Sequence, residues 1–109
     1  MIGSLRILKL LGQKKRFDML MLLYKKGELR IVDISNAIDN PQYDTSHHMA
    51  KFRRFGFVRS YRHGNGVYYS ISPTIPRLAL NIIKESSLIE KEYVSILTGK
   101  IGGKYKNEP

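Results

Sequence analysis

The side chains best suited to specific recognition lie in one stretch with helical spacing, from Gln42 to Lys51. Glutamine can form two hydrogen bonds to the edge of adenine, and serine and histidine can donate to guanine or to phosphate. A helix carries such groups into the major groove of DNA with its exposed first half foremost. The sequence therefore predicts base contacts from Gln42, Tyr43, Ser46 and His47. The alternative is that these residues are ordinary exposed polar side chains or phosphate contacts.

Positive charge surrounds this stretch. Between Asn40 and Tyr69 there are five lysines and arginines and a single acid, Asp44, which we expect to cap the helix start. Residues 14–16 are all cations at the start of another helix, where they oppose the helix dipole. This suggests that they are placed there for a contact outside the fold, such as one to phosphate. The alternative is a solvated basic face. The predicted contacts to the DNA backbone, from the helices and the wing, are Lys14, Lys15, Lys51, Arg54, Arg62, His63 and Asn65.

Metal and catalytic chemistry have little support in the sequence. His47 and His48 are adjacent, and neighbours on a helix point about 100° apart, so they chelate one ion poorly. The sequence has no cysteine, which excludes disulfides, thiolate metal sites and cysteine redox sensing. It also has no glycine-rich phosphate loop, nucleophile elbow or zinc-ligand spacing. We therefore expect no enzymatic activity, no cofactor and no bound metal.

The elements that must position these residues follow from hydrophobic spacing. Helical periods occur in four segments: Leu5–Leu11, Lys14–Lys26, Asp33–Ile38 and Tyr43–Phe55. Two β-rich runs flank a His-Gly-Asn-Gly turn suited to a tight hairpin, and a third run can pair as a short strand; these are Phe57–Tyr61, Val67–Ile71 and Glu28–Ile31. Two short helices followed by a hairpin form the winged helix-turn-helix pattern. The predicted fold class is α+β, mostly helical: a winged helix-turn-helix with a two-stranded β-hairpin wing and a long C-terminal dimerisation helix.

The orientation of the proposed reading helix follows from its turn and its apolar period. We expect Asn40 to cap the helix and Pro41 to occupy its first position. The residues that should face the core are Thr45, His48, Met49, Phe52 and Phe55.

The C-terminal part predicts self-association. Ile75–Leu97 reads as one long helix with apolar residues at alternating spacings of four and three, which is a heptad seam. So apolar a helix in a small domain needs a partner surface, and a two-fold homodimer is the preferred interpretation. The alternative is that the helix folds back on its own domain. The predicted interface consists of Leu5, Leu8, Ile75, Leu78, Ile82, Ile89, Tyr93 and Ile96. Residues 1–98 are expected to form the domain, and 99–109 a flexible basic tail.

The stretch Thr45–Ser60, TSHHMAKFRRFGFVRS, resembles the recognition helix of the ArsR-type winged-helix repressors, which reads S-H-H-L and then L-x-x-x-G-L-V. Val67–Ile71 is similar to the strand that follows the wing in that family. The resemblance covers roughly Leu8–Pro73 and implies a winged-helix protein that binds DNA.

The same resemblance argues against metal sensing by thiolates. Glu28–Ile34 is similar to the segment that reads E-L-C-V-C-D-L in metal-sensing members, but Arg30 and Val32 stand at the two cysteine positions. The long C-terminal helix also has no histidine or aspartate with which to build the other metal site of the family.

Composition is consistent with a polyanionic partner. The 109 residues carry a net charge of +10, which favours nucleic acid first and an anionic membrane surface second. No apolar run reaches the ~18 residues of a membrane span, so we expect a cytoplasmic protein of a prokaryotic or virus-infected cell. The use of Lys, Ile and Tyr favours a thermophilic archaeon or its virus. The leading hypothesis is a homodimeric, sequence-specific regulator of double-stranded DNA. The alternatives are a winged-helix module that binds protein or RNA, and an architectural protein that coats DNA without sequence preference.

Overall fold

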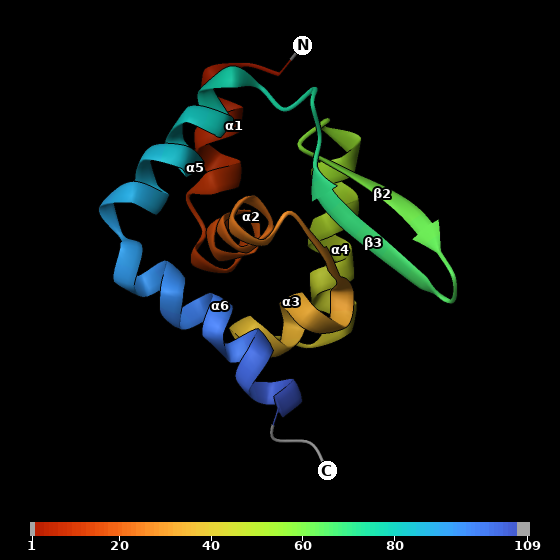
Figure 1. The fold of residues 1–109 in the computed structure, drawn as a ribbon. Coiled ribbons are helices and arrows are strands. Elements are labelled where there is room, and N and C mark those ends of the chain that lie inside the picture. Colours follow the sequence, from red (N-terminus) through yellow and green to blue (C-terminus); the bar gives the residue numbers. More distant parts are fainter. Residues whose placement is uncertain (1, 107–109) are drawn as a thin grey trace.

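The computed structural model describes the backbone of residues 2–106 and the side chains of residues 2–101. The predicted winged helix-turn-helix fold is confirmed, with α3 and α4 as the helix-turn-helix and β2–β3 as the wing (Figure 1). The helices and strands, in chain order, are α1 Ser4–Leu11, α2 Lys14–Lys26, β1 Glu28–Arg30, α3 Ile31–Ile38, α4 Gln42–Arg54, β2 Val58–His63, β3 Gly66–Ile71, α5 Arg77–Ile89 and α6 Lys91–Lys106.

The core is built around α2, which the other helices surround (Figure 1). Six consecutive residues of this helix, Asp18–Leu23, are buried, so it contacts neighbours on all sides rather than along one stripe. Gly27 closes α2 with a positive φ of 91°, and its N–H donates to the carbonyl of Leu23 at 2.9 Å. The molecule thus has two opposite sides, with α4 and the hairpin on one and α1 with α5 on the other.

The sheet has three strands in the order β1–β3–β2, all antiparallel. The wing is longer than the sequence predicted: its strands pair from Val58 opposite Ile71 to His63 opposite Gly66. A two-residue turn joins them, and Gly64 supplies the positive φ, at 60°. The third strand, β1, adds to the predicted two-stranded hairpin and anchors the base of the wing beside α3.

The prediction of one long C-terminal helix over Ile75–Leu97 is wrong. The chain bends at Glu90, which has φ −108° and ψ 45°, and this bend separates α5 from α6. The physical reason is burial: after the bend α6 packs against α2 and α3 and buries Val94, Leu97 and Ile101. A straight helix would carry these side chains away from the core.

This bend also divides the predicted dimer seam. Ile75, at 8% exposure, is buried within its own chain, and Tyr93 is half-buried against α2. Leu78 and Ile89 remain exposed on α5. The predicted domain boundary at Gly99 falls inside α6, which continues to Lys106, and residues 107–109 lie outside the described part of the chain.

Candidate nucleic-acid interface

The outer face of α4 carries all four residues predicted to contact bases. Gln42, Tyr43, Ser46 and His47 are exposed, and their spacing places them on one side of the helix. Their side chains form no hydrogen bonds with other side chains in the described part of the chain, so their polar groups are free for a ligand. The opposite face confirms the predicted orientation, since it buries Thr45, His48, Met49 and Phe52, whereas Phe55 is only half-buried.

A hydrogen-bond network around Asn40 holds the first turn of α4. The Asn40 side chain, in a residue that is 7% exposed, donates from Nδ2 to Asp44 Oδ2 at 2.9 Å and to Thr45 Oγ1 at 3.0 Å. Its Oδ1 accepts from Lys15 Nζ at 2.7 Å, and Ser35 of α3 donates to Thr45 Oγ1 at 2.8 Å. The buried amide therefore joins the turn to α2 and α4, and Thr45 connects α3 to the same network, which fixes the angle at which α4 leaves the turn.

The predicted cap of α4 is wrong by one residue. The N-cap is Pro41 rather than Asn40, and no side chain caps the backbone there. Asp44 lies in the first turn, as expected, but its carboxylate accepts from Asn40 instead of capping a backbone N–H. This hydrogen bond lowers the pKa of Asp44 below its usual value.

His48 belongs to the core, as the sequence predicted. Burial is the main cause that lowers its pKa, and its Nε2 lies 3.3 Å from Asp44 Oδ2. Its Nδ1 is buried without a hydrogen-bond partner in the described structure. Across residues 2–101, no three histidine, aspartate or glutamate side chains gather closely enough to hold a metal ion.

The wing presents a second set of cations. Arg59 of β2 donates to Ser70 Oγ at 3.4 Å, and Arg53 reaches the hairpin from α4 and donates to Ser60 Oγ at 3.1 Å. Arg62, in contrast, is exposed near the tip and forms no ion pair or side-chain hydrogen bond with the described residues. His63 and Asn65 are exposed there as well. Tyr61 stacks on Tyr68 with ring centroids 5.8 Å apart and donates to the Glu28 carboxylate, and this stiffens the hairpin.

The cations at the start of α2 have partners within the fold, which give them a structural role there, and the phosphate contacts of Lys14 and Lys15 stay a prediction. Arg16 donates to the carbonyls of Leu10 and Lys9 at 2.7 and 3.0 Å and thereby closes α1. Lys14 Nζ lies 2.8 Å from Asp18 Oδ2 and 2.5 Å from the Tyr93 hydroxyl, and these contacts raise the pKa of Lys14.

The structure does not bring all the predicted backbone contacts together. Lys15 extends from α2 to the start of α4, where its ammonium group donates to Asn40. Lys51 is half-buried and lies farther along α4. Lys14 instead faces α6. Arg54 is the last residue of α4, at the end opposite Gln42, where its guanidinium lies 5.4 Å from the centre of the Phe55 ring.

Sequence reasoning assigned Asn40 only a capping role and missed its central position. The Asn-Pro dipeptide indicates a turn, and two partners of Asn40, Asp44 and Thr45, are near it in sequence. The third partner, Lys15, lies on α2 and cannot be found from a local pattern.

Two further findings concern the whole chain. No helix within residues 2–106 is long and apolar enough to cross a membrane. No family model matches the chain.

Individual proteins do match it. The chain is 33% identical over 93 residues to the arsenical resistance operon repressor of Escherichia coli, a match that spans 85% of this chain and 80% of the relative. The crystal structure of the transcriptional repressor PagR of Bacillus anthracis matches with a TM-score of 0.61 and 28% identity, over 74% of this chain and 88% of that one. The homodimeric winged helix-turn-helix DNA-binding domain of Mb0332 from Mycobacterium bovis matches with a TM-score of 0.63 over 83% of this chain and 80% of that one; at 22% identity this likeness shows the fold.

Proposed function

The chain belongs to the ArsR family of winged-helix transcriptional regulators, and we propose that it binds a specific site on duplex DNA as a homodimer. The observation that carries this proposal is the exposed polar face of α4, whose side chains have no hydrogen-bond partners in the described chain while a buried network holds the helix itself. A rigidly held helix with free donors and acceptors is suited to reading base edges.

In the proposed complex the first half of α4 enters the major groove. Gln42, Tyr43, Ser46 and His47 face the bases, while Lys15 and Lys51 contact phosphates on either side of the groove. The hairpin tip, with Arg62, His63 and Asn65, contacts the adjacent backbone or minor groove. Arg54 and Lys14 lie apart from this face, so among the predicted contacts to the DNA backbone these two have the least support.

The proposed dimer interface lies on the opposite side of the molecule. There α1 and α5 lie side by side (Figure 1), and Leu5, Leu8 and Leu78 are 66, 50 and 39% exposed. Apolar side chains grouped on two adjacent helices are stabilised when a second copy covers them. A two-fold dimer would place its two α4 helices about one DNA turn, roughly 34 Å, apart and would read a palindrome.

The metal-sensing cysteine positions of the family have another role in this chain. Arg30 lies at one of them, and its guanidinium is 3.3 Å from Asp33 Oδ1 while its backbone N–H donates to Asp33 Oδ2 at 3.0 Å. These contacts stabilise the first turn of α3. We propose that DNA binding by this chain is not controlled by a thiolate metal site, since the sequence contains no cysteine.

Selection of bound duplexes from a random pool tests the proposal. A palindromic consensus, bound roughly 10³-fold more tightly than random duplex, is the expected result. Absence of any enriched sequence would instead favour an architectural protein or a binder of another macromolecule.

Two variants then separate base reading from backbone contact. We expect Gln42→Ala to change the preferred base at one position of each half-site, because it removes a bidentate donor and acceptor. Arg62→Ala should weaken all duplexes alike and reduce the slope of log K against log salt by about one unit. Unchanged binding of the selected site by both variants would show that DNA contacts another face.

A further inference from the structure

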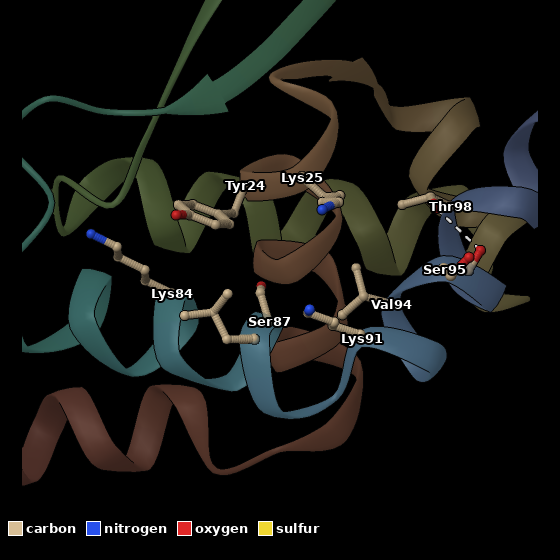
Figure 2. A pocket seen from close by; sticks show the side chains of 9 residues that line it. Tyr24, Lys25, Lys84, Ser87, Lys91, Val94, Ser95 and Thr98 are labelled. Carbon is tan, nitrogen blue, oxygen red and sulfur yellow. Dashed lines mark hydrogen bonds between the residues drawn. The ribbon is translucent and has the colours of Figure 1, made fainter.

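A pocket of 410 Å³ lies where the end of α2 meets the bend between α5 and α6 (Figure 2). In Figure 2, Tyr24 and Lys25 extend from α2 on one side, and Lys84, Ser87 and Lys91 extend from α5 and α6 on the other. The volume lies in the range of about 300–1,000 Å³ that small-molecule sites occupy. The pocket is separate from both the outer face of α4 and the exposed leucines of α1.

The charges around this pocket are all of one sign. Lys25, Lys84 and Lys91 line it, and no acidic side chain is among the lining residues. None of these three ammonium groups forms an ion pair with any group in residues 2–101. In Figure 2 the ammonium groups of Lys25 and Lys91 lie at the same hollow, whereas that of Lys84 extends away from them, past Tyr24. Two like charges at one hollow repel one another, and an anion bound between them would relieve that repulsion.

The remaining wall is partly apolar and partly hydroxyl-bearing. Val94, at 2% exposure, lies at the bottom, and Leu88 and the Tyr24 ring extend the apolar surface. The hydroxyl of Ser95 has no hydrogen-bond partner among the described residues, whereas that of Thr98 is engaged with the Ser95 carbonyl at 3.1 Å. A fitting molecule would therefore need both an anionic head and an apolar body.

We propose that this pocket binds a small amphipathic organic anion, with a carboxylate or phosphate head between the lysines and an apolar body against Val94 and Leu88. The head would form charge-assisted hydrogen bonds with Lys25 of α2 and Lys91 of α6, whose ammonium groups lie at the same hollow in Figure 2. Inorganic phosphate has the charge without the body, and a neutral alcohol has the body without the charge, so neither satisfies the whole pocket.

The position of the pocket gives the ligand a route to the DNA-binding helices. Lys84 and Ser87 belong to α5, whereas Lys91, Val94 and Ser95 belong to α6, which packs on α3. A bound anion joins the helices on both sides of Glu90 and so favours one angle between them. This regulatory part rests on the proposed function: the anion changes the affinity for DNA, and by linkage DNA changes the affinity for the anion by the same factor.

Calorimetric titration of the full chain without DNA tests the site itself. Octanoate is the probe, and n-octanol and inorganic phosphate are the two controls. We expect saturable octanoate binding at one site per chain, with much weaker binding of either control. The double variant Lys25→Gln with Lys91→Gln should weaken octanoate binding by about tenfold or more. Lys26→Gln, a neighbouring exposed lysine outside the pocket, should leave it unchanged.

Three results would overturn the proposed site. They are no octanoate binding, binding of n-octanol or phosphate as tight as that of octanoate, and a loss of octanoate binding in the Lys26→Gln variant equal to that in the double variant. Thermal melting of each variant checks that the chain is folded. DNA affinity is then measured with and without octanoate on the selected duplex. An unchanged affinity would reject the regulatory part, whereas octanoate binding to a chain that selects no duplex would reject the proposed function and leave the site standing.

Discussion

At the scale of single residues, the buried amide of Asn40 is the most consequential group near the proposed DNA interface. It joins Lys15 of α2 to Asp44 and Thr45 of α4, while Thr45 also accepts from Ser35 of α3. Each of these residues contacts the back of the turn rather than the bases. They are positioning residues for α4, and the specificity of the exposed face depends on them indirectly.

Asn40→Ala removes three hydrogen bonds and leaves Thr45 and Lys15 with fewer partners. We expect a loss of about 2–3 kcal/mol in the free energy of unfolding, and weaker binding of the selected duplex without a change in the preferred bases. Urea denaturation and duplex titration measure the two effects. The control is Asn81→Ala, since the Asn81 side chain is exposed and forms no hydrogen bond in the described structure. Equal stabilities of the two variants would contradict the positioning role.

His48 makes stability depend on pH. Burial lowers its pKa below 6.5, so the folded chain binds a proton at this ring less readily than the unfolded chain does. As the pH falls below about 6.5, the unfolded state therefore gains more protons, and the free energy of unfolding decreases. The contribution is fully present above that pH and is lost progressively below it. Denaturation at pH 7.5 and pH 5.5 checks this, and His48→Gln should show a smaller difference between the two.

At the scale of elements, the C-terminal helices show how a heptad pattern can mislead. The apolar spacing over Ile75–Leu97 is the same whether the helix extends to a second copy or folds back on its own domain. The structure shows the second arrangement for α6, which turns back to bury Val94 and Leu97 against the core, whereas α5 lies beside α1 with exposed leucines. The bend thus links the proposed dimer face to the helix-turn-helix.

Tyr93 fastens α6 to α2, because its hydroxyl donates to Asp18 Oδ2 at 2.6 Å beside Lys14 Nζ. Tyr93→Phe keeps the ring and leaves the buried Asp18 carboxylate with one partner fewer. We expect a loss of about 1–2 kcal/mol in the free energy of unfolding, measured by urea denaturation. Tyr43→Phe is the matched control, since the Tyr43 hydroxyl is exposed and has no partner among the described residues. A Tyr93 variant as stable as the control would show that this bond does not hold α6.

At the scale of the whole molecule, the surfaces on the two sides of α2 differ in chemistry. One side presents α4 and the basic wing, and the other presents apolar residues of α1 and α5 (Figure 1). A net charge of +10 draws the chain to any polyanion, so charge alone provides no specificity. In the proposed complex, specificity comes from the side chains of α4 and from the spacing that a dimer imposes.

Leu8→Glu places a charge in the proposed dimer face, where half of the leucine side chain is now exposed. Sedimentation should show a monomer for this variant and a dimer for the unaltered chain, because burying the new carboxylate without a partner is costly. Duplex affinity should fall as well, since the two half-sites are then bound independently. Val67→Glu, on the wing, should remain a dimer. A dimeric Leu8→Glu variant would place the interface elsewhere.

Local sequence patterns determined much of this protein by themselves. The first four helices, the hairpin and the orientation of α4 follow from the periods of 3.6 and 2 residues and from turn chemistry, which act between near neighbours. For this reason the sequence alone predicts Thr45, His48 and Met49 in the core, and all three are buried there. The missing cysteines were equally plain in the sequence.

Only the tertiary structure decided the features that join distant segments. These are the bend at Glu90, the pairing of β1 with β3, and the partners of the cations that open α2. Lys14 meets Tyr93 across 79 positions and Lys15 meets Asn40 across 25, and no local period contains that information. The proposed ligand pocket has the same origin. Its lysines lie on three helices, and they line one hollow only because burial of the apolar face of α6 folds the chain back onto its own core.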